Sequence, residues 1–277
     1  MPELPEVETV VRGLRQCLTG QTIAGVTVHW ARSIGRPDPE AFIARVTGRT
    51  VQTVNRRGKW IVICLDEGQA LLVHLRMTGQ LLFEGSGCRP DKYARVIFHL
   101  ESGCRLRFSD MRKFGRLILT NDPGDVLDDL GPEPLGASFT VERFQQMLSQ
   151  RRGRIKSLLL DQRFLVGLGN IYVNEALWQA RIHPLRSGDS LSTAEVGALY
   201  DAIRSILRAA IGEGGTTLAN GNYRQADGAA GEFASELLAY DREGEPCACC
   251  GAEIERITVG QRGTYVCPDC QEAPCTD

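Results

Sequence analysis

Residues 247–270 read CACCGAEIERITVGQRGTYVCPDC and decide the fold of the C-terminal part of the chain. The stretch contains two C-x-x-C pairs separated by sixteen residues, Cys247 with Cys250 and Cys267 with Cys270. Each pair brings two thiolates to one ion when its turn is tight, and four sulfurs complete the closed tetrahedral shell of structural zinc. We therefore expect these four cysteines to hold one structural Zn²⁺ ion.

The segment between the two pairs predicts a hairpin. RITVGQRGTYV alternates as a strand does on both sides of a glycine-rich centre, which places Arg262 near the tip. Residues 241–277 are thus expected to form a zinc-finger hairpin. Cys249 and Cys275 are left over, and Cys249 lies inside the first pair, where it is a competing candidate ligand.

The distribution of the ten cysteines favours a metal site over a disulfide scaffold. Six lie between residues 247 and 275, and the others are scattered along the chain as Cys17, Cys64, Cys88 and Cys104. In a reducing compartment such scattered cysteines are ordinary small apolar or surface residues. Disulfides or a redox pair are the alternatives to zinc.

Helical patterns precede the hairpin over residues 139–240. VERFQQML and IYVNEALWQA show helical spacing, and a longer helix opens at Ser192, where Glu195 three residues later completes a capping box. Residues 214–235 form a Gly- and Ala-rich loop. We expect a mostly helical domain here.

Strand patterns fill residues 22–120. The β-branched runs TIAGVTVHW, KWIVICL, YARVIFHL and GRLILT are separated by Gly, Asp and Asn turns, which predicts an antiparallel β-sandwich. An amphipathic helix precedes them, because apolar residues recur at helical spacing until Gly20, namely Val7, Val10, Val11, Leu14 and Leu18. Residues 121–138, with DPGD and GPEPLG, are the expected linker. The fold class is therefore α+β multidomain, with residues 1–120 as its first domain.

Composition sets the broad class. A chain of 277 residues with 43% apolar residues can bury a real core, and its length favours two compact domains over one. It holds no run of 18 or more apolar residues, and the opening PELPEVE is too acidic for a secretory or mitochondrial leader. We expect a soluble cytoplasmic protein with no membrane partner.

Charge is segregated along the chain although the net charge is only −2. Five cations fall within twelve residues: Arg105, Arg107, Arg112, Lys113 and Arg116. Acidic residues follow at once: Asp122, Asp125, Asp128, Asp129 and Glu133. Nucleic-acid affinity would have to come from such local segregation, and two solvated faces of opposite sign are the alternative.

Several segments resemble bacterial formamidopyrimidine-DNA glycosylases, the Fpg/MutM family. PELPEVET at residues 2–9 resembles the family's opening almost letter for letter. Further segments follow in the family's order across nearly the whole chain: RRGKW (56–60), HLRMTGQL (74–81), SDMRKFG (109–115), LGPEPL (130–135), GLGNIYVNEALWQARIHP (167–184) and the zinc finger. The resemblance implies a bifunctional DNA-repair enzyme. It would excise oxidised purines, 8-oxoguanine and formamidopyrimidines, from duplex DNA and then cleave the abasic site. In its helical domain GLGNIYVNEALWQA would form a helix-two-turn-helix, and residues 219–223 would belong to a lesion loop that contacts the expelled base.

The resemblance also implies catalytic roles. Once Met1 is removed, Pro2 offers a secondary amine, and α-amino groups have a neutral fraction at physiological pH. Pro2 would attack the sugar C1′ and form a Schiff-base (iminium) intermediate, followed by β- and δ-elimination. Glu3 would donate a proton to the opening sugar, Lys59 would act near the lesion, and Arg262 would bind DNA phosphate and assist δ-elimination.

Two of these residues have non-catalytic alternatives. Glu3, like Glu6, would stabilise a helix N-terminus through its dipole, and Lys59 would be a surface charge on a hairpin.

DNA contacts follow from the need to flip the damaged base out of the duplex. Met77, Arg112 and Phe114 match the family's inserted wedge, although Met77 alone also fits a core position. Asn170, with backbone amides at a helix start, would hold a phosphate, and a simple N-cap is the alternative. Further expected contacts are Arg151, Lys156 and His74, the last with a buried strand histidine as its alternative.

The chain departs from the family pattern at two places. Tyr93 stands where many relatives carry a DNA-contacting His, so that contact is weakened or made by the phenol hydroxyl. After GGTTL, relatives commonly read Arg-Asp and then an aromatic residue, whereas this chain has Ala219, Asn220, Gly221, Asn222 and Tyr223. We therefore expect altered preference among oxidised purines.

The overall expectation is a monomer that acts on damaged double-stranded DNA at the nucleoid and needs no cofactor beyond zinc. Two rival functions are an endonuclease VIII-like enzyme that excises oxidised pyrimidines and a catalytically silent damage-binding protein.

Overall fold

The computed structural model describes residues 1–88, 91–219 and 221–274. It divides into two compact units. Unit 1 comprises Met1–Asp128 with Ala210–Ala234, and unit 2 comprises Asp129–Ala209 with Ser235–Asp277. The Gly- and Ala-rich segment thus belongs with the N-terminal part, whereas we expected it in the helical domain, and the zinc finger shares a unit with the helices.

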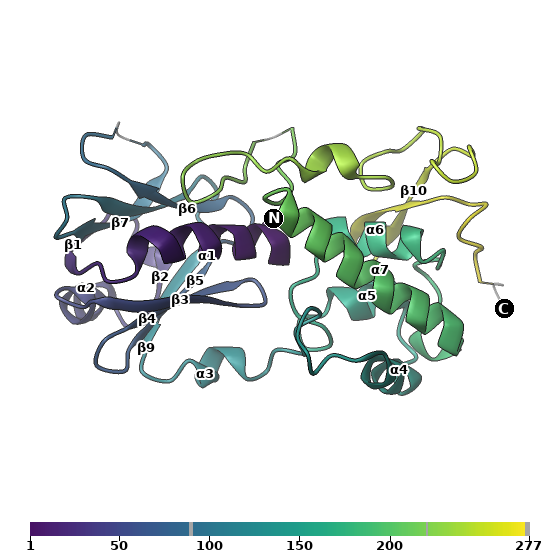
Figure 1. Ribbon diagram of the computed structural model, residues 1–277, viewed down its shortest axis with the longest axis horizontal. Helices are drawn as coiled ribbons and strands as arrows, with labels where there is room; N and C mark the ends of the chain where they lie inside the picture. Colours follow the sequence, from purple (N-terminus) through teal and green to yellow (C-terminus); the bar gives the residue numbers. More distant parts are fainter. Residues whose placement is uncertain (89–90, 220, 275–277) are drawn as a thin grey trace. The chain divides into compact units, whose positions relative to one another are not determined.

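Unit 1 is built around helix α1 and two sheets. The four-stranded sheet has the order β1-β7-β8-β6, and the five-stranded sheet has the order β2-β9-β5-β4-β3 (Figure 1). The elements are α1 (Leu4–Leu18), β1 (Ile23–Val28), η1 (Ala31–Ser33), β2 (Ile34–Arg36), α2 (Pro39–Val46), β3 (Val51–Arg57), β4 (Trp60–Leu65), β5 (Ala70–His74), β6 (Gly79–Glu84), β7 (Ala94–Leu100), β8 (Arg105–Asp110), β9 (Arg116–Thr120) and α3 (Gly124–Leu127).

One hydrophobic core joins α1 to both sheets. Val10 and Leu14 of α1 pack in the same cluster as Val73 of β5 and Phe98 of β7. The period of apolar residues therefore placed the buried face of α1 correctly. Among the described strands, β2 and β9 pair in parallel, which differs from the expected all-antiparallel sandwich, because β2 is a short edge strand laid beside a partner far along the chain.

Unit 2 is helical with one hairpin. Its elements are α4 (Val141–Ser149), α5 (Ile155–Leu160), α6 (Asn170–Gln179), η2 (Gly188–Ser190), α7 (Thr193–Gly212, whose last residues belong to unit 1), η3 (Phe233–Glu236, shared with unit 1), β10 (Glu255–Val259) and β11 (Arg262–Val266). The predicted capping box is present, because the Ser192 N–H donates to Glu195 Oε2 at 2.7 Å and the Glu195 N–H donates to Ser192 Oγ at 3.3 Å.

Among the described residues, no helix is both long and apolar enough to cross a bilayer.

Candidate functional site

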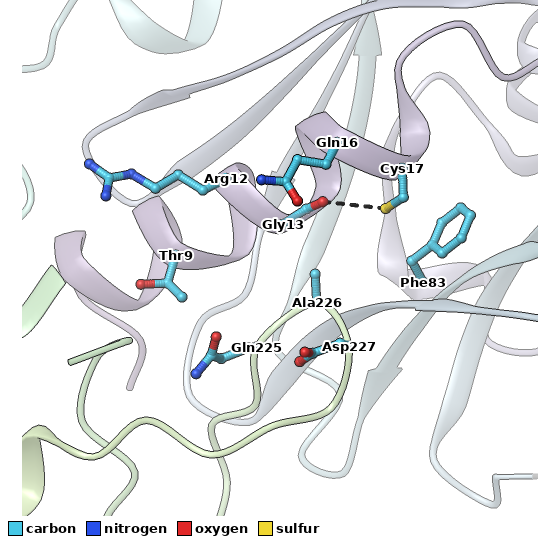
Figure 2. Close-up of a pocket in the computed structure, with 9 residues that line it drawn as sticks. All are labelled: Thr9, Arg12, Gly13, Gln16, Cys17, Phe83, Gln225, Ala226 and Asp227. Carbon is cyan, nitrogen blue, oxygen red and sulfur yellow. Dashed lines mark hydrogen bonds between the residues drawn. The ribbon is translucent and has the colours of Figure 1, made fainter. Parts of the chain in front are cut away.

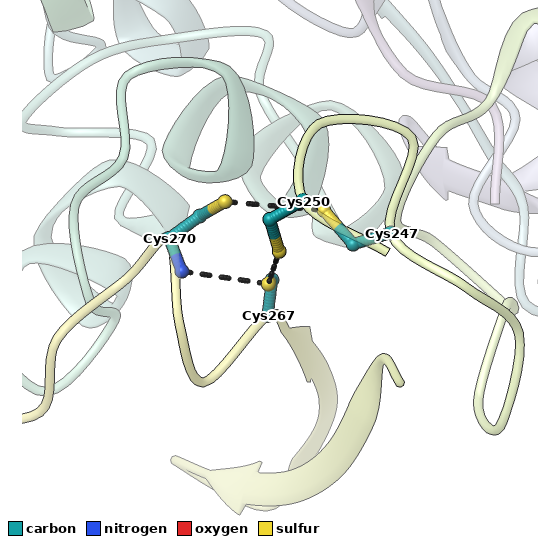
Figure 3. A group of neighbouring side chains, drawn as sticks. All are labelled: Cys247, Cys250, Cys267 and Cys270. Atoms are coloured by element: carbon teal, nitrogen blue, oxygen red, sulfur yellow. Dashed lines mark hydrogen bonds between the residues drawn. The ribbon is translucent and has the colours of Figure 1, made fainter. Parts of the chain in front are cut away.

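The four predicted zinc ligands converge. Cys247 and Cys250 precede β10, Cys267 and Cys270 follow β11, and all four sulfurs lie within 4.8 Å of one another (Figure 3). Among the described cysteines every thiol is free, so the disulfide alternative is wrong. The donor set and spacing fit one structural zinc ion.

The two cysteines left over from this set have different outcomes. Cys249 is exposed, and its sulfur accepts a hydrogen bond from Arg181 Nη2 at 3.1 Å, outside the four-sulfur group. Cys275 lies outside the described residues.

The N-terminal residues are fixed by a carboxylate that bridges two segments. Glu3 precedes α1 and forms a capping box with Glu6, in which Glu6 Oε2 accepts from the Glu3 N–H at 2.7 Å. Glu6 Oε1 accepts from the Thr216 N–H at 2.8 Å. Pro2 is buried beside this pair. Glu3 therefore caps α1, while its role as a proton donor stays a prediction, and Glu6 ties the start of the chain to the 210–234 segment.

Lys59 and His74 lie on neighbouring strands. Lys59 lies in the β3–β4 turn and is buried, so it is not a surface charge. His74 pairs with Trp60, and their ring centroids are 4.8 Å apart. Burial, followed by the positive charges of Arg76 and Lys59, lowers the pKa of His74 to about 3. Because His74 Nδ1 accepts from the Arg76 N–H at 3.0 Å, the ring proton of this neutral histidine is on Nε2.

The three predicted wedge residues are all exposed. Met77 is 39% exposed and Phe114 is 48% exposed, so the core alternative for Met77 is wrong. The Arg112 guanidinium carbon lies 4.9 Å from the centroid of the Phe114 ring. Arg112 and Phe114 lie in the loop of residues 111–115, the wedge loop. Met111 of this loop is also exposed and was not predicted from the sequence.

Part of the predicted basic segment is neutralised within the sheet. Arg105 Nε donates to Glu84 Oε2 at 2.7 Å, and Arg107 Nε donates to Glu84 Oε1 at 3.0 Å. Arg107 also pairs with Asp91. These two arginines stabilise the β6–β8 ladder, so the exposed cations of the segment lie further on, in the wedge loop.

The segment after α7 packs on unit 1. Tyr223 is buried in its core cluster, and its hydroxyl donates to the Gly214 carbonyl at 2.9 Å. The Ala226 carbonyl accepts from the Phe83 N–H at 2.8 Å. Tyr223 is thus a core residue here, which corrects the expectation that it faces an expelled base, while Asn220 lies outside the described residues.

A cavity of about 410 Å³ lies between α1 and the 225–227 turn (Figure 2). Its lining residues are Thr9, Arg12, Gly13, Gln16, Cys17, Phe83, Gln225, Ala226 and Asp227. None of the predicted site residues is among them. The Cys17 thiol donates to the Gly13 carbonyl at 3.3 Å, as expected for an ordinary half-buried cysteine in a helix.

In unit 2, Asn170 lies beside the zinc hairpin. Gly169 is the N-cap of α6 and Asn170 is its first residue, so the N-cap alternative is wrong. Asn170 Nδ2 donates to the Gly263 carbonyl at 3.0 Å, and among the described residues its buried Oδ1 accepts no hydrogen bond. Arg262, the first residue of β11, is exposed. Asn170 thus contacts the residue next to Arg262, which brings the two predicted phosphate-binding residues close together.

Three family models match the chain in order. They are the formamidopyrimidine-DNA glycosylase N-terminal domain over residues 1–117, the formamidopyrimidine-DNA glycosylase H2TH domain over residues 130–221, and the zinc finger found in FPG and IleRS over residues 244–273. The formamidopyrimidine-DNA glycosylase of Herpetosiphon aurantiacus is 48% identical over 274 residues, which cover 98% of this chain and 100% of that protein. The chain belongs to the formamidopyrimidine-DNA glycosylase family. It is therefore a DNA glycosylase of base-excision repair.

Solved structures of formamidopyrimidine-DNA glycosylases share the fold. Lactococcus lactis Fpg (MutM), in complex with DNA containing N7-benzyl-Fapy-dG, matches with a TM-score of 0.91 at 36% identity, covering 98% of this chain and 100% of that one. MutM (FPG) from Thermus thermophilus matches with a TM-score of 0.89 at 41% identity, covering 99% and 100%. The predicted α+β fold, with its helix, sheets, helix-two-turn-helix domain and zinc finger, is confirmed.

The prediction that Lys156 of this glycosylase contacts DNA is wrong. Lys156 is fully buried, and its Nζ donates to Thr264 Oγ1 at 2.7 Å and to Asn174 Oδ1 and the Gly263 carbonyl at 3.2 Å each. A buried ammonium with these partners cannot also reach a phosphate. We therefore assign Lys156 to the docking of the zinc hairpin on α6.

The remaining predicted contacts of this glycosylase stay predictions. Arg151 is exposed just before α5. Tyr93 is half-buried, and the Lys92 ammonium lies 5.0 Å from the centroid of its ring.

Sequence reasoning missed a buried carboxylate that shapes unit 2 of the glycosylase. Glu175 on α6 accepts backbone N–H groups from Leu238, Ala239 and Tyr240 at 2.6 to 3.0 Å. Burial raises the pKa of Glu175, although these three donors oppose the shift. The sign in the sequence was a single Glu within the helical segment NIYVNEALWQ. Such a Glu can lie on the buried or on the exposed face of a helix, so its burial was not predicted.

Proposed function

We propose that the chain is a bifunctional DNA glycosylase and abasic-site lyase that excises oxidised purines from duplex DNA through an iminium on Pro2. The observation that carries the proposal is the anchored N-terminus. Pro2 precedes a helix whose first turn is closed by Glu3 and Glu6, and Glu6 also accepts from Thr216. The amine of Pro2 is thus attached to a backbone that is fixed on two sides.

The chemistry requires Met1 to be removed, because the nitrogen of a Met1–Pro2 amide has no available lone pair. The free amine attacks C1′, the glycosidic bond breaks, and the base leaves with the bonding electrons and takes up a proton. Glu3 donates a proton to the sugar ring oxygen as the ring opens, and the nitrogen lone pair forms the C=N bond of the iminium. Loss of a C2′ proton then expels the 3′ phosphate, and a second elimination expels the 5′ phosphate.

Further residues support the elimination steps. Lys59 is a buried cation next to His74, whose neutral ring offers an Nε2–H donor to a phosphate oxygen. Asn170 and the exposed Arg262 form a second donor group in unit 2. Zinc, when bound, holds the hairpin that carries Arg262 and supplies no reaction chemistry.

The proposed partner is damaged duplex DNA, bound by a monomer in the bacterial cytoplasm and at the nucleoid. The exposed Met77, Arg112 and Phe114 form the wedge that fills the space left by a flipped base. Preference among oxidised purines is set in part by the residues from Ala219 to Asn222.

Borohydride trapping tests the proposal. Zinc-loaded enzyme beginning at Pro2, incubated with an 8-oxoguanine duplex and borohydride, should give a covalent adduct that maps to Pro2, and Pro2→Gly should slow it sharply. Protein that retains Met1 is the matched control and should give none. An adduct on a lysine would overturn the mechanism, a preference for thymine glycol would favour the pyrimidine-specific rival, and no adduct on any substrate, including an abasic site, would favour a silent binding protein.

A further inference from the structure

A buried polar cluster joins the two turns that carry the wedge. Asp110, at the end of β8, is 1% exposed, and Thr78, just before β6, is 7% exposed. The Thr78 hydroxyl donates to Asp110 Oδ1 at 2.5 Å and accepts from the Arg112 N–H at 3.0 Å. Thr78 and Asp110 thus form one hydrogen-bonded centre. Met77 directly precedes Thr78 in the chain, and the Arg112 N–H donates to the centre.

The carboxylate of Asp110 closes the wedge loop at both of its ends. Oδ1 accepts from the Arg112 N–H at 3.1 Å, and Oδ2 accepts from the Gly115 N–H at 2.7 Å. Gly115 is required here because a Cβ would lie 2.4 Å from Phe108 Cζ and 3.2 Å from Asp110 Oδ2. The loop thus turns tightly around one carboxylate.

The main chain of Asp110 is held as firmly as its side chain. Its N–H donates to the Tyr93 carbonyl at 2.9 Å, and its carbonyl accepts from Arg95 Nε at 2.7 Å. Asp110 also pairs with Gly79 in the β6–β8 ladder. The centre is therefore buried at the end of the β6–β8 ladder, and hydrogen bonds to the sheet fix the position of both turns.

The wedge side chains themselves receive little support. Phe114 and Met77 are exposed apolar groups, and Arg112 lies against the Phe114 ring. Exposed side chains on an unrestrained loop would have to be ordered at the moment they enter the duplex, which weakens insertion. A loop fixed beforehand by Asp110 and Thr78 avoids that ordering step.

We propose that Asp110 and Thr78 are positioning residues for base extrusion, which hold Met77, Arg112 and Phe114 as one preorganised wedge. This rests on the proposed function, because it assigns a role within the same glycosylase reaction. Asp110 and Thr78 touch neither base nor sugar in this role and act only through the two turns.

The test compares Thr78→Val, which removes one hydroxyl at constant shape, with Thr27→Val, which removes an exposed hydroxyl of β1 that contacts His99. Single-turnover excision of 8-oxoguanine should fall about tenfold in Thr78→Val and stay unchanged in Thr27→Val. Strand cleavage at a preformed abasic site should change less than about threefold, because no base has to be unstacked. Asp110→Asn should have the larger effect, since in either orientation its NH2 group would face an N–H donor, that of Gly115 or that of Arg112.

A second measurement separates positioning from simple destabilisation. In a Phe114→Ala background, Thr78→Val should cause a smaller loss of excision than in the wild-type background, because one of the three side chains that Thr78 helps to position is already gone. Equal losses on both substrates, additive losses in the double variant, or full excision by Thr78→Val would each overturn the proposal. If the wild-type enzyme itself neither excises 8-oxoguanine nor cleaves the abasic site, the proposed function fails instead, and the two failures are thereby distinguished.

Discussion

Asp110 in unit 1 and Lys156 in unit 2 are buried charges of opposite sign that solve the same problem. Each organises a surface feature proposed to meet DNA, the wedge loop in one case and the zinc hairpin in the other. Asp110 collects N–H and O–H donors, whereas Lys156 offers donors to a carbonyl, an amide oxygen and a hydroxyl. The sign follows from the groups around each site, because the wedge loop presents two N–H groups and a hydroxyl donor to Asp110, whereas three oxygen acceptors surround Lys156.

The difference also concerns what supports each feature. The wedge loop is attached to two sheets of four and five strands that share a core, so one carboxylate suffices to fix its conformation. The hairpin has a small core of its own, formed by Cys247, Ile254, Tyr265 and Cys267, and needs both zinc and Lys156.

Loss of zinc should have the largest effect in the molecule. Cys250→Ser should release the metal, unfold the hairpin and weaken duplex binding about 100-fold, because Arg262 and the hairpin edge lose their positions. Metal analysis should find one zinc ion per wild-type chain and none in the variant. Cys249→Ser is the matched control and should keep both zinc and binding; tight DNA binding by zinc-free protein would contradict this assignment.

Lys156→Met should lower the free energy of unfolding by about 3 kcal/mol, because three acceptors around a buried site lose their donor. Denaturant unfolding measures this loss. If Lys156 contacted a phosphate directly, Lys156→Met would leave the free energy of unfolding unchanged. The slope of log binding constant against log salt would then fall by about one phosphate contact. Arg151→Ala, an exposed cation of the same unit, serves as the control for that second behaviour.

Acidification should weaken unit 1 through His74. Its folded-state pKa lies below its unfolded value, so the unfolded chain binds the extra proton and the free energy of unfolding falls as pH drops from about 6.5 toward 3. The slope from this group is about 1.4 kcal/mol per pH unit. Thermal melts of wild type and His74→Gln between pH 4 and 7 isolate it, since Gln keeps a side-chain N–H donor and does not titrate; parallel curves would show that His74 does not contribute.

Phe114→Ala should have the smallest effect on stability and a selective effect on activity. The ring is exposed, so the free energy of unfolding should change by less than about 0.5 kcal/mol. Excision of 8-oxoguanine should slow about tenfold, while cleavage of a preformed abasic site is less affected. Matched losses on both substrates would indicate that Phe114 supports the fold and not the wedge.

Local patterns predicted the parts that local patterns can specify. The C-x-x-C spacing, the helical period of α1 and the capping box at Ser192 each depend on residues close in sequence, and the structure agrees with all three. The wedge residues stay predictions, and they were singled out because the family motifs contain them.

The misplaced and missed residues depend on distant partners. Lys156 is buried by a strand more than one hundred residues later, and no feature near RIKSLLL reveals that Gly263 and Thr264 will cover it. Thr78 and Asp110 are 32 residues apart and look like ordinary turn residues within their motifs. The local sequence places Tyr223 in a ligand-facing loop, whereas its hydroxyl donates to the carbonyl of Glu6, 217 residues earlier in the chain.

The discontinuity of unit 1 has a consequence for how the protein is made. Its core cluster includes Tyr223 and Ala226, which are synthesised long after the sheets. The 106 residues from 129 to 234 take about 5 to 20 s to translate, during which the face of α1 that Ala226 covers is open on the nascent chain. The segment that carries the proposed nucleophile Pro2 is therefore made early but completes its hydrogen bonds late, since Thr216 reaches Glu6 only when most of the chain has emerged.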